Sequence, residues 1–284
     1  MLVDDIKKYY SQSKSVATGT QKTCKVNKGL AYLTDLKPLP PSNYDRTINQ
    51  FTRKQSKTQH AIDLGVNTPK LVCAFLSNGH MVEVQEQAPG DILFSYSQDS
   101  AKYKFLNDVQ RNLPENRFFN SLMKEKQKEF NYKQLRILAN APQEHYNKLF
   151  ADAKVLACQA GCSLGDIHCE NLNYDTEKGF YFLDLYFPTF IEMYSDFDVF
   201  DETFVFLRDI VMYYEDTPSV FENEIKQHMG SIIKKCLNAT INNNFNIEES
   251  SFSENRFLIL RCCGQELGNS ILQEYYAKKF NKQQ

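Results

Sequence analysis

The spacing of hydrophobic residues divides the chain into a strand-rich first third and a helix-rich remainder. Short apolar or alternating runs that end at turn residues predict strands at 15–26 (broken by a small-residue turn), 30–36, 71–76 and 80–85. The clearest signal is Ser77-Asn78-Gly79 between two apolar runs, which is typical of a β-hairpin. Residues 43–64 are polar but compatible with a helix, which Gly65 would end.

Beyond Asp91 the apolar residues recur at helical spacing. The predicted helices are 98–112, 117–130, 143–160, 201–214, 219–237 and 254–280. One hairpin interrupts them, with a strand at 172–174, a turn at 175–179 and a second strand that ends at Asp184. We therefore expect an α+β fold with a small β-rich part, residues 1–87, and a larger, mainly helical part, residues 88–284. Two lobes around a cleft are the simplest arrangement of these elements.

Composition and charge exclude several classes of protein. Hydrophobic residues make up 42% of the 284 residues, which argues against global disorder. The net charge of −2 gives no reason to expect binding to nucleic acid. No apolar run approaches the roughly 20 residues of a membrane helix, so we expect no membrane span.

The location expected for the protein follows from its first residues and its cysteines. Residues 1–10 are charged and lack the apolar core of a signal peptide. The eight cysteines are scattered and form no disulfide or zinc pattern, which favours a reducing compartment. We expect a monomer in the cytoplasm of the producing cell. Secretion into a host cell through a needle-type apparatus leaves no mark in a sequence and stays open.

Three polar residues stand out around the predicted hairpin: Asp166, Asn171 and Asp184. The hairpin would bring its two ends together and place Asn171 beside Asp184, with Asp166 just upstream. Two oxygen ligands beside a third carboxylate suit Mg²⁺-phosphate chemistry, because hard oxygen donors hold the metal while the free carboxylate orients a hydroxyl.

These residues and this order of elements resemble the protein-kinase-like superfamily. The closest likeness is to its divergent bacterial branches, which are the aminoglycoside and choline phosphotransferases and the type III effector kinases. Their catalytic-loop patterns, H-G-D-x-H-x-x-N or H-x-D-x-x-x-x-N, are similar to Leu164-Gly165-Asp166-Ile167-His168-Cys169-Glu170-Asn171, and Leu183-Asp184-Leu185-Tyr186 follows. Residues 62–70 resemble the link from the small-lobe helix to its fourth strand, and residues 82–90 resemble the fifth strand and hinge.

The resemblance implies ATP and Mg²⁺ as cofactors. Asp166 would be the catalytic residue that positions the substrate hydroxyl, while Asn171 and Asp184 would hold the metal. The residues implied to bind the nucleotide are Thr18, Gly19 and Thr20 in the first turn, Lys37 after the third strand, Gln55 on the helix, and Glu86 and Ala88 beside the adenine.

The chain departs from the family pattern at several positions. Leu164 replaces the first histidine of the catalytic loop, and the phosphate loop has a single glycine, Gly19. Lys37 is the best placed phosphate-binding lysine by spacing, with Lys25 and Lys28 as alternatives. The helix offers no clear glutamate to pair with that lysine. Glutamines stand where it would be, and they supply no charge; they are Gln50, Gln55 and Gln59, of which Gln55 is best placed.

The expected activity is transfer of the γ-phosphate of ATP to a hydroxyl, by a Ser/Thr protein kinase of the bacterial-effector type. Its partner would be a protein substrate, with host proteins among the candidates. A kinase for a small hydroxylated molecule, such as an aminoglycoside, choline or a sugar, is the first alternative, and Gly165-Asp166-Ile167-His168 and the long helical tail favour it. A nucleotide-binding pseudokinase that acts as an interaction module is the second alternative.

Overall fold

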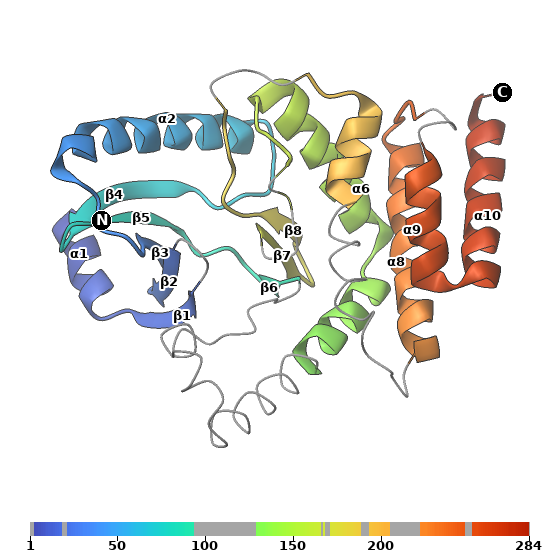
Figure 1. The fold of residues 1–284 in the computed structure, drawn as a ribbon, viewed down its shortest axis with the longest axis horizontal. Helices are drawn as coiled ribbons and strands as arrows, with labels where there is room; N and C mark the ends of the chain where they lie inside the picture. The colour runs from blue at the N-terminus through green and yellow to red at the C-terminus, as the bar shows by residue number, and fades with distance from the viewer. Residues whose placement is uncertain are drawn as a thin grey trace, which may run out of the picture. The chain divides into compact units, whose positions relative to one another are not determined.

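The computed structural model describes residues 3–18, 22–93, 129–165, 167, 171–188, 193–204, 222–247 and 252–283. These residues have an α+β fold and group into two compact units (Figure 1). Unit 1 contains the described residues of 1–64 and 68–88, and unit 2 contains residues 65–67, 89–93 and the described residues from 129 onward. Residues 65–67 thus belong to unit 2, although the chain on both sides of them belongs to unit 1.

Unit 1 is built on a five-stranded antiparallel sheet. In spatial order, its strands are β1 (Lys14–Thr18), β2 (Lys22–Asn27), β3 (Leu30–Asp35), β5 (His80–Glu86) and β4 (Leu71–Ser77). The helix α1 (Val3–Ser11) precedes the sheet, while a short 3₁₀ turn, η1 (Pro41–Asn43), and the helix α2 (Tyr44–Asp63) connect β3 to β4. The strands predicted in this region and the helix predicted at 43–64 are confirmed to within a few residues.

The two helices of unit 1 cover opposite faces of the sheet. Val82 and Val84 of β5 are buried in a cluster with Ile6 of α1, whereas the buried Met81 packs with Phe51 of α2. Because successive side chains of a strand point to opposite faces, α1 lies on one face and α2 on the other. The apolar residues that predicted these strands therefore belong to two separate hydrophobic clusters, one on each face of the sheet.

Tight turns join neighbouring strands in unit 1. Lys28 and Gly29 connect β2 to β3, and Asn78 and Gly79 connect β4 to β5, with positive φ at all four residues. Two consecutive positive φ values are what a type I′ hairpin turn requires. The hairpin predicted around 77–79 is confirmed.

Unit 2 is mainly helical and contains one small antiparallel sheet of β6 (Asp91–Ile92), β7 (Leu172–Asp175) and β8 (Gly179–Phe182), in that order. Its helices are 129–140, α6 (Gln143–Val155) with a terminal π turn η2 (Leu156–Ala160), 196–204, α8 (Glu222–Asn242), α9 (Ser253–Cys263) and α10 (Gln265–Gln283). α6 packs on the hairpin, and the rings of Tyr146 and Phe180 meet at 5.2 Å. None of the helices in the described ranges is both long enough and apolar enough to cross a bilayer.

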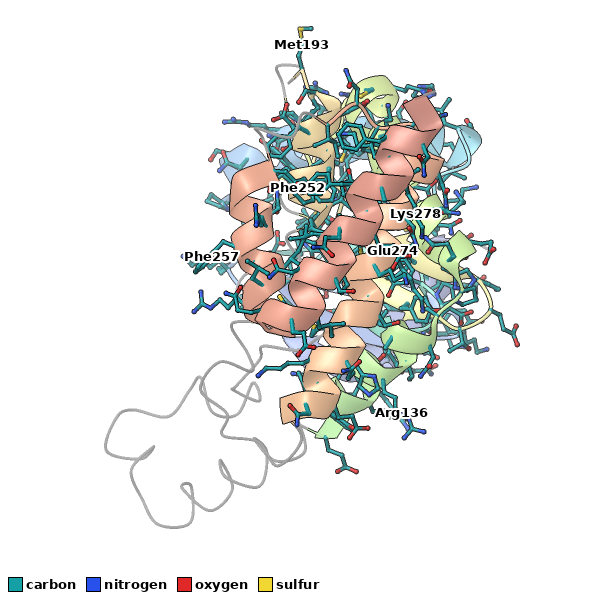
Figure 2. All side chains as sticks on the ribbon, turned by 90° about the vertical axis from the view of Figure 1, so that its right-hand side faces the viewer. Arg136, Met193, Phe252, Phe257, Glu274 and Lys278 are labelled. Atoms are coloured by element: carbon teal, nitrogen blue, oxygen red, sulfur yellow. The ribbon has the colours of Figure 1, made fainter. Side chains whose placement is uncertain are left out.

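The single helix predicted at 254–280 is wrong, because α9 and α10 are separate helices that meet at Gly264. Gly264 has φ +79° and ψ 165°, a backbone conformation that is essentially restricted to glycine, and the chain reverses there (Figure 2). Phe252 immediately precedes α9, and its ring stacks on those of Phe200 and of Tyr275 of α10, with ring centroids 5.5 Å apart in both cases. Much of the helices predicted at 98–112, 117–130 and 201–214 lies outside the described residues.

Candidate functional site

The β7–β8 hairpin brings Asn171 close to Asp184. Leu172 pairs with Phe182 at the end of the ladder, and the Leu183 N–H donates to the Asn171 carbonyl oxygen at 2.8 Å. This bond extends the pairing one step beyond the strands and sets Asn171 beside the residue that precedes Asp184. The predicted hairpin is confirmed, although its second strand ends at Phe182 rather than at Asp184.

Asp184 has an unusual backbone conformation for a residue with a side chain, with φ +43°. Three other described non-glycine residues have positive φ: Lys28 and Asn78 are in hairpin turns, and Asn244 follows the end of α8. Asp184 instead follows the last strand of the small sheet. A non-glycine residue in this region typically carries about 1–3 kcal/mol of strain, and such residues concentrate at functional sites. The conformation turns the chain sharply at the predicted metal ligand.

The segment that leads to Asp166 is anchored by two buried apolar residues. Leu164 is fully buried and Ile167 nearly so, and the Ile167 N–H donates to the Leu164 carbonyl oxygen at 2.9 Å. Leu164, where the family pattern has a histidine, therefore serves as a packing residue. Asp166 itself lies outside the described residues, as does His168.

The chain before Asp166 is also joined to the chain after Asp184. The Ser163 N–H donates to the Tyr186 carbonyl oxygen at 2.9 Å, which forms an isolated antiparallel bridge. The Tyr194 hydroxyl accepts from the Leu164 N–H at 3.2 Å and lies 3.3 Å from the Ser163 hydroxyl. Hydrogen bonds thus connect the segment that precedes Asp166 to the segment that follows Asp184.

The π turn at the end of α6 leads directly into the segment that contains Ser163 and Leu164. Gly161 ends the turn in the left-handed conformation, and the Cys162 N–H donates to the Leu156 carbonyl oxygen at 2.9 Å. Such turns are rare and frequently occur at functional sites. Ser163 follows directly, so a backbone irregularity immediately precedes the predicted catalytic loop.

Asn171 and Asp184 have the donor atoms that a Mg²⁺-nucleotide site requires. Protein sites for Mg²⁺ usually supply one or two carboxylate or amide oxygens and leave the other positions to phosphate and water. The backbone hydrogen bond from Leu183 to Asn171 holds Asn171 near Asp184, the residue that follows Leu183. Within the described ranges, no three or more His, Cys, Asp or Glu side chains group as a metal site on their own.

The chain that follows unit 1 is fixed to the same hairpin. The Asn173 side-chain amide donates to the carbonyl oxygens of Pro89 and Gly90 at 3.3 and 3.4 Å. β6 then pairs with β7, with Asp91 opposite Tyr174. Residues 91–92 are thereby part of the small sheet of unit 2, and residues 89–90 are bonded to it.

Residues 65–67 are held by a buried carboxylate and an exposed lysine of α6 and by the backbone of β8. The Asp152 carboxylate accepts from the Asn67 N–H at 3.1 Å and pairs with Lys148 at 2.5 Å. Lys148 also donates to the Gly65 carbonyl oxygen at 2.6 Å, and the Phe182 N–H donates to the Asn67 carbonyl oxygen at 2.9 Å. Burial raises the pKa of Asp152, and the bonds from Lys148 and Asn67 oppose the rise.

The predicted nucleotide-binding residues of unit 1 have varied surroundings. Thr18 is the last residue of β1, while Gly19 and Thr20 lie outside the described residues. Glu86 ends β5 with its side chain exposed, and Ala88 is half-buried at the end of unit 1.

Lys37 and Gln55, which the resemblance places at the nucleotide, have different surroundings among the described residues. Lys37 is exposed and lies two residues beyond the end of β3. The side-chain amide of Gln55 donates to the carbonyl oxygens of Leu71 and Val72 at 3.0 and 2.9 Å. Gln55 therefore links α2 to β4, because its side-chain amide donates hydrogen bonds to two carbonyl oxygens of that strand.

A charged cluster that the sequence reasoning missed lies on the same face of the sheet as α2. The Glu83 carboxylate of β5 is 3.0 Å from the ammonium of Lys22 on β2 and 3.5 Å from that of Lys54 on α2. All three side chains are largely buried, with 15–23% of their surface exposed. The available signal was a glutamate placed between two apolar strand residues, Val82 and Val84.

No model of a known protein family matches the chain, and no curated protein matches it significantly.

Proposed function

We propose that the chain is an ATP- and Mg²⁺-dependent phosphotransferase with a two-lobed kinase-like fold, and that it acts as a Ser/Thr protein kinase of the bacterial-effector type. The observation that carries the proposal is the backbone around Asp184, which bends at φ +43° beside the bond from Leu183 to Asn171. Strained backbone concentrates at functional sites, and a carboxylate near an amide oxygen offers the donor atoms that Mg²⁺ binds.

The order of elements supports the same function. After α1, three strands, a helix and two more strands precede a mainly helical unit that carries a single hairpin. This is the order implied by the resemblance to kinases, and it extends over most of the described chain. Fold likeness alone does not define an activity, so the argument depends on the residues of the hairpin.

In this proposal each residue of the hairpin region has a defined task. Asn171 and Asp184 hold Mg²⁺, which when bound neutralises charge on the nucleotide phosphates. Asp166 orients the hydroxyl of the substrate and accepts its proton as the hydroxyl oxygen bonds to the γ-phosphorus and the bond from that phosphorus to the leaving ADP breaks. The contacts of Ser163 and Leu164 keep the Asp166 segment next to the chain that follows Asp184. Catalysis would come from positioning and from charge stabilisation.

A nucleotide-binding pseudokinase is the second candidate, and the contacts in unit 1 favour it. β3 contains no lysine, Lys37 is exposed beyond it, and Gln55 is directed at β4. A site that lacked a phosphate-binding lysine would bind a nucleotide and transfer its phosphate slowly or not at all.

The test compares the full chain with Asp166→Ala and Asp184→Ala, and uses Glu177→Ala as a control because that carboxylate is exposed in the hairpin turn. Binding of MgATP is measured by calorimetry, and transfer is measured with labelled ATP on the chain itself, a generic protein and a host lysate. We expect Asp166→Ala to bind MgATP and to lose at least about 100-fold in transfer. Asp184→Ala should lose the Mg²⁺ dependence of binding, and Glu177→Ala should match the wild type.

Each candidate function has a distinct failure. Labelling by the wild type that does not exceed that of the two site variants would reject the kinase. MgATP binding without transfer would identify the pseudokinase. Undiminished transfer by Asp184→Ala would reject the metal assignment.

A further inference from the structure

The strand expected to carry the phosphate-binding lysine has none. β3 reads Leu-Ala-Tyr-Leu-Thr-Asp, and the residues that share a face with Glu83 are Ala31, Leu33 and Asp35. Lys37 comes two residues after the strand and is exposed. A cation on the α2 face of this sheet must therefore come from another element.

Two alternative lysines lie on the wrong face. The Lys25 ammonium is over the ring of Tyr10 at 4.9 Å, and that of Lys28 is over the ring of Tyr9 at 4.4 Å. Both tyrosines belong to α1, which covers the face opposite to α2. Their cation–π contacts direct these lysines away from the Glu83 face.

Lys22 is on the same face as Glu83 and belongs to the predicted phosphate loop. It pairs in register with Asp35, two residues from the row in which Cys24, Leu33 and Glu83 lie side by side. Its ammonium is 3.0 Å from the Glu83 carboxylate. It also begins β2 and belongs to Thr18-Gly19-Thr20-Gln21-Lys22-Thr23, the stretch that the resemblance assigns to the phosphates.

Glu83 ties three elements together at this point. One carboxylate oxygen faces Lys22 of β2 and the other faces Lys54 of α2. A carboxylate that is largely buried would be costly without such partners, so the two ion pairs constrain each other's positions. An ammonium has three N–H donors, and Lys22 can keep Glu83 while it donates to a second anion.

We propose that Lys22 is the lysine that contacts the nucleotide phosphates, and that Glu83 is the positioning residue that holds its ammonium in place. The inference rests on the proposed function, because it assigns the cation of that same nucleotide site. The lysine would then come from β2, and its acidic partner would come from β5 rather than from the helix α2.

The experiment measures binding of MgATP and of adenosine to the full chain by calorimetry, for Lys22→Met, Lys37→Met, Lys25→Met and Lys54→Met. A hydrogen bond to a charged group contributes about 1.5–3 kcal/mol, so Lys22→Met should weaken MgATP binding by about 10- to 100-fold. Adenosine binding should not change, because adenosine has no phosphate. Lys37→Met and Lys25→Met should stay within about 2-fold of the wild type. Lys54→Met removes the other partner of Glu83 and should cost less than about 3-fold.

If Glu83 acts only by positioning Lys22, the effect of replacing Glu83 on MgATP binding should require Lys22. Glu83→Gln should weaken MgATP binding in the wild type and have no further effect in the Lys22→Met background. Lys22→Arg keeps the charge and should retain more MgATP affinity than Lys22→Met, with the same melting temperature.

The outcomes separate this assignment from the proposed function. Unchanged MgATP binding in a folded Lys22→Met, or the loss found in Lys37→Met instead, overturns the assignment and leaves the kinase standing. Equal losses in Lys22→Met and Lys54→Met would show a structural role only and also overturn it. A wild type that binds no MgATP overturns the proposed function together with this inference.

Discussion

The backbone of Tyr174 occupies the space in which a side chain on Gly90 would have to lie. An added Cβ would overlap the Tyr174 carbonyl, and Gly90 also has φ +76°, which side chains disfavour. This close approach is what allows β6 to start at Asp91 and pair with β7. Gly90 is therefore needed twice, for its conformation and for its size.

Gly90→Ala should destabilise unit 2 strongly. We expect a loss of at least about 3 kcal/mol, because the overlap is with backbone and the strain at positive φ adds to it. Gly29→Ala is a matched control, with φ +75° and nothing within 4 Å of the added Cβ, and should cost only about 1–2 kcal/mol. Chemical denaturation measures both, and equal losses would contradict the role of Tyr174.

Substitutions at Asp184 should separate stability from activity. Asp184→Gly relieves the strain at φ +43°, so it should be about 1 kcal/mol more stable than Asp184→Ala. Both variants should lose Mg²⁺-dependent binding of ATP, because both lack the carboxylate. Thermal denaturation with and without MgATP tests this, and an alanine variant as stable as the glycine variant would argue against strain at this residue.

Gln55 should prove to be structural rather than nucleotide-binding. Gln55→Met keeps most of the volume but loses the two bonds to the β4 carbonyls, which should cost about 1–3 kcal/mol of stability. Gln59→Met is the control, since the amide of Gln59 bonds only the exposed Asp63 among the contacts described here. MgATP affinity of folded Gln55→Met should equal that of the wild type, and a selective loss of affinity would restore the role implied by the resemblance.

Asp152 should make stability depend on pH in an unusual direction. Burial raises its pKa in the folded chain above the ordinary aspartate value of about 3.9, so the folded state binds its proton more tightly than the unfolded state does. The stability from this group is complete below that value and is lost as the pH rises through the folded pKa. Asp152→Asn cannot titrate, so the wild type should lose stability relative to this variant as the pH rises. Denaturation across that range measures the difference, and the opposite trend would reject the raised pKa.

The sequence predicted the features that depend on neighbouring residues. Asn78-Gly79 encodes its own turn, and the apolar residues around Asn171 and Asp184 mark both strands of the second hairpin. β6 was missed because two residues carry no pattern, and Asp91 becomes a strand residue only opposite Tyr174.

The charged cluster needed the fold for a similar reason. Lys22, Lys54 and Glu83 are far apart in sequence, and only the strand register and the position of α2 bring them together. Gly264 was visible in the sequence, but its φ and ψ, which end one helix and begin another, are set by the way α9 and α10 pack.

Residues 65–67 determine where the protein can be cut into independently folding pieces. A fragment that began at residue 89 would lack Asn67, which bonds Asp152 and the Phe182 N–H. It would also leave a buried carboxylate with Lys148 as its remaining partner among the contacts described here. Unit 2 therefore includes three residues that lie within the sequence of unit 1, and a protease that cleaved on either side of them should release no stable product.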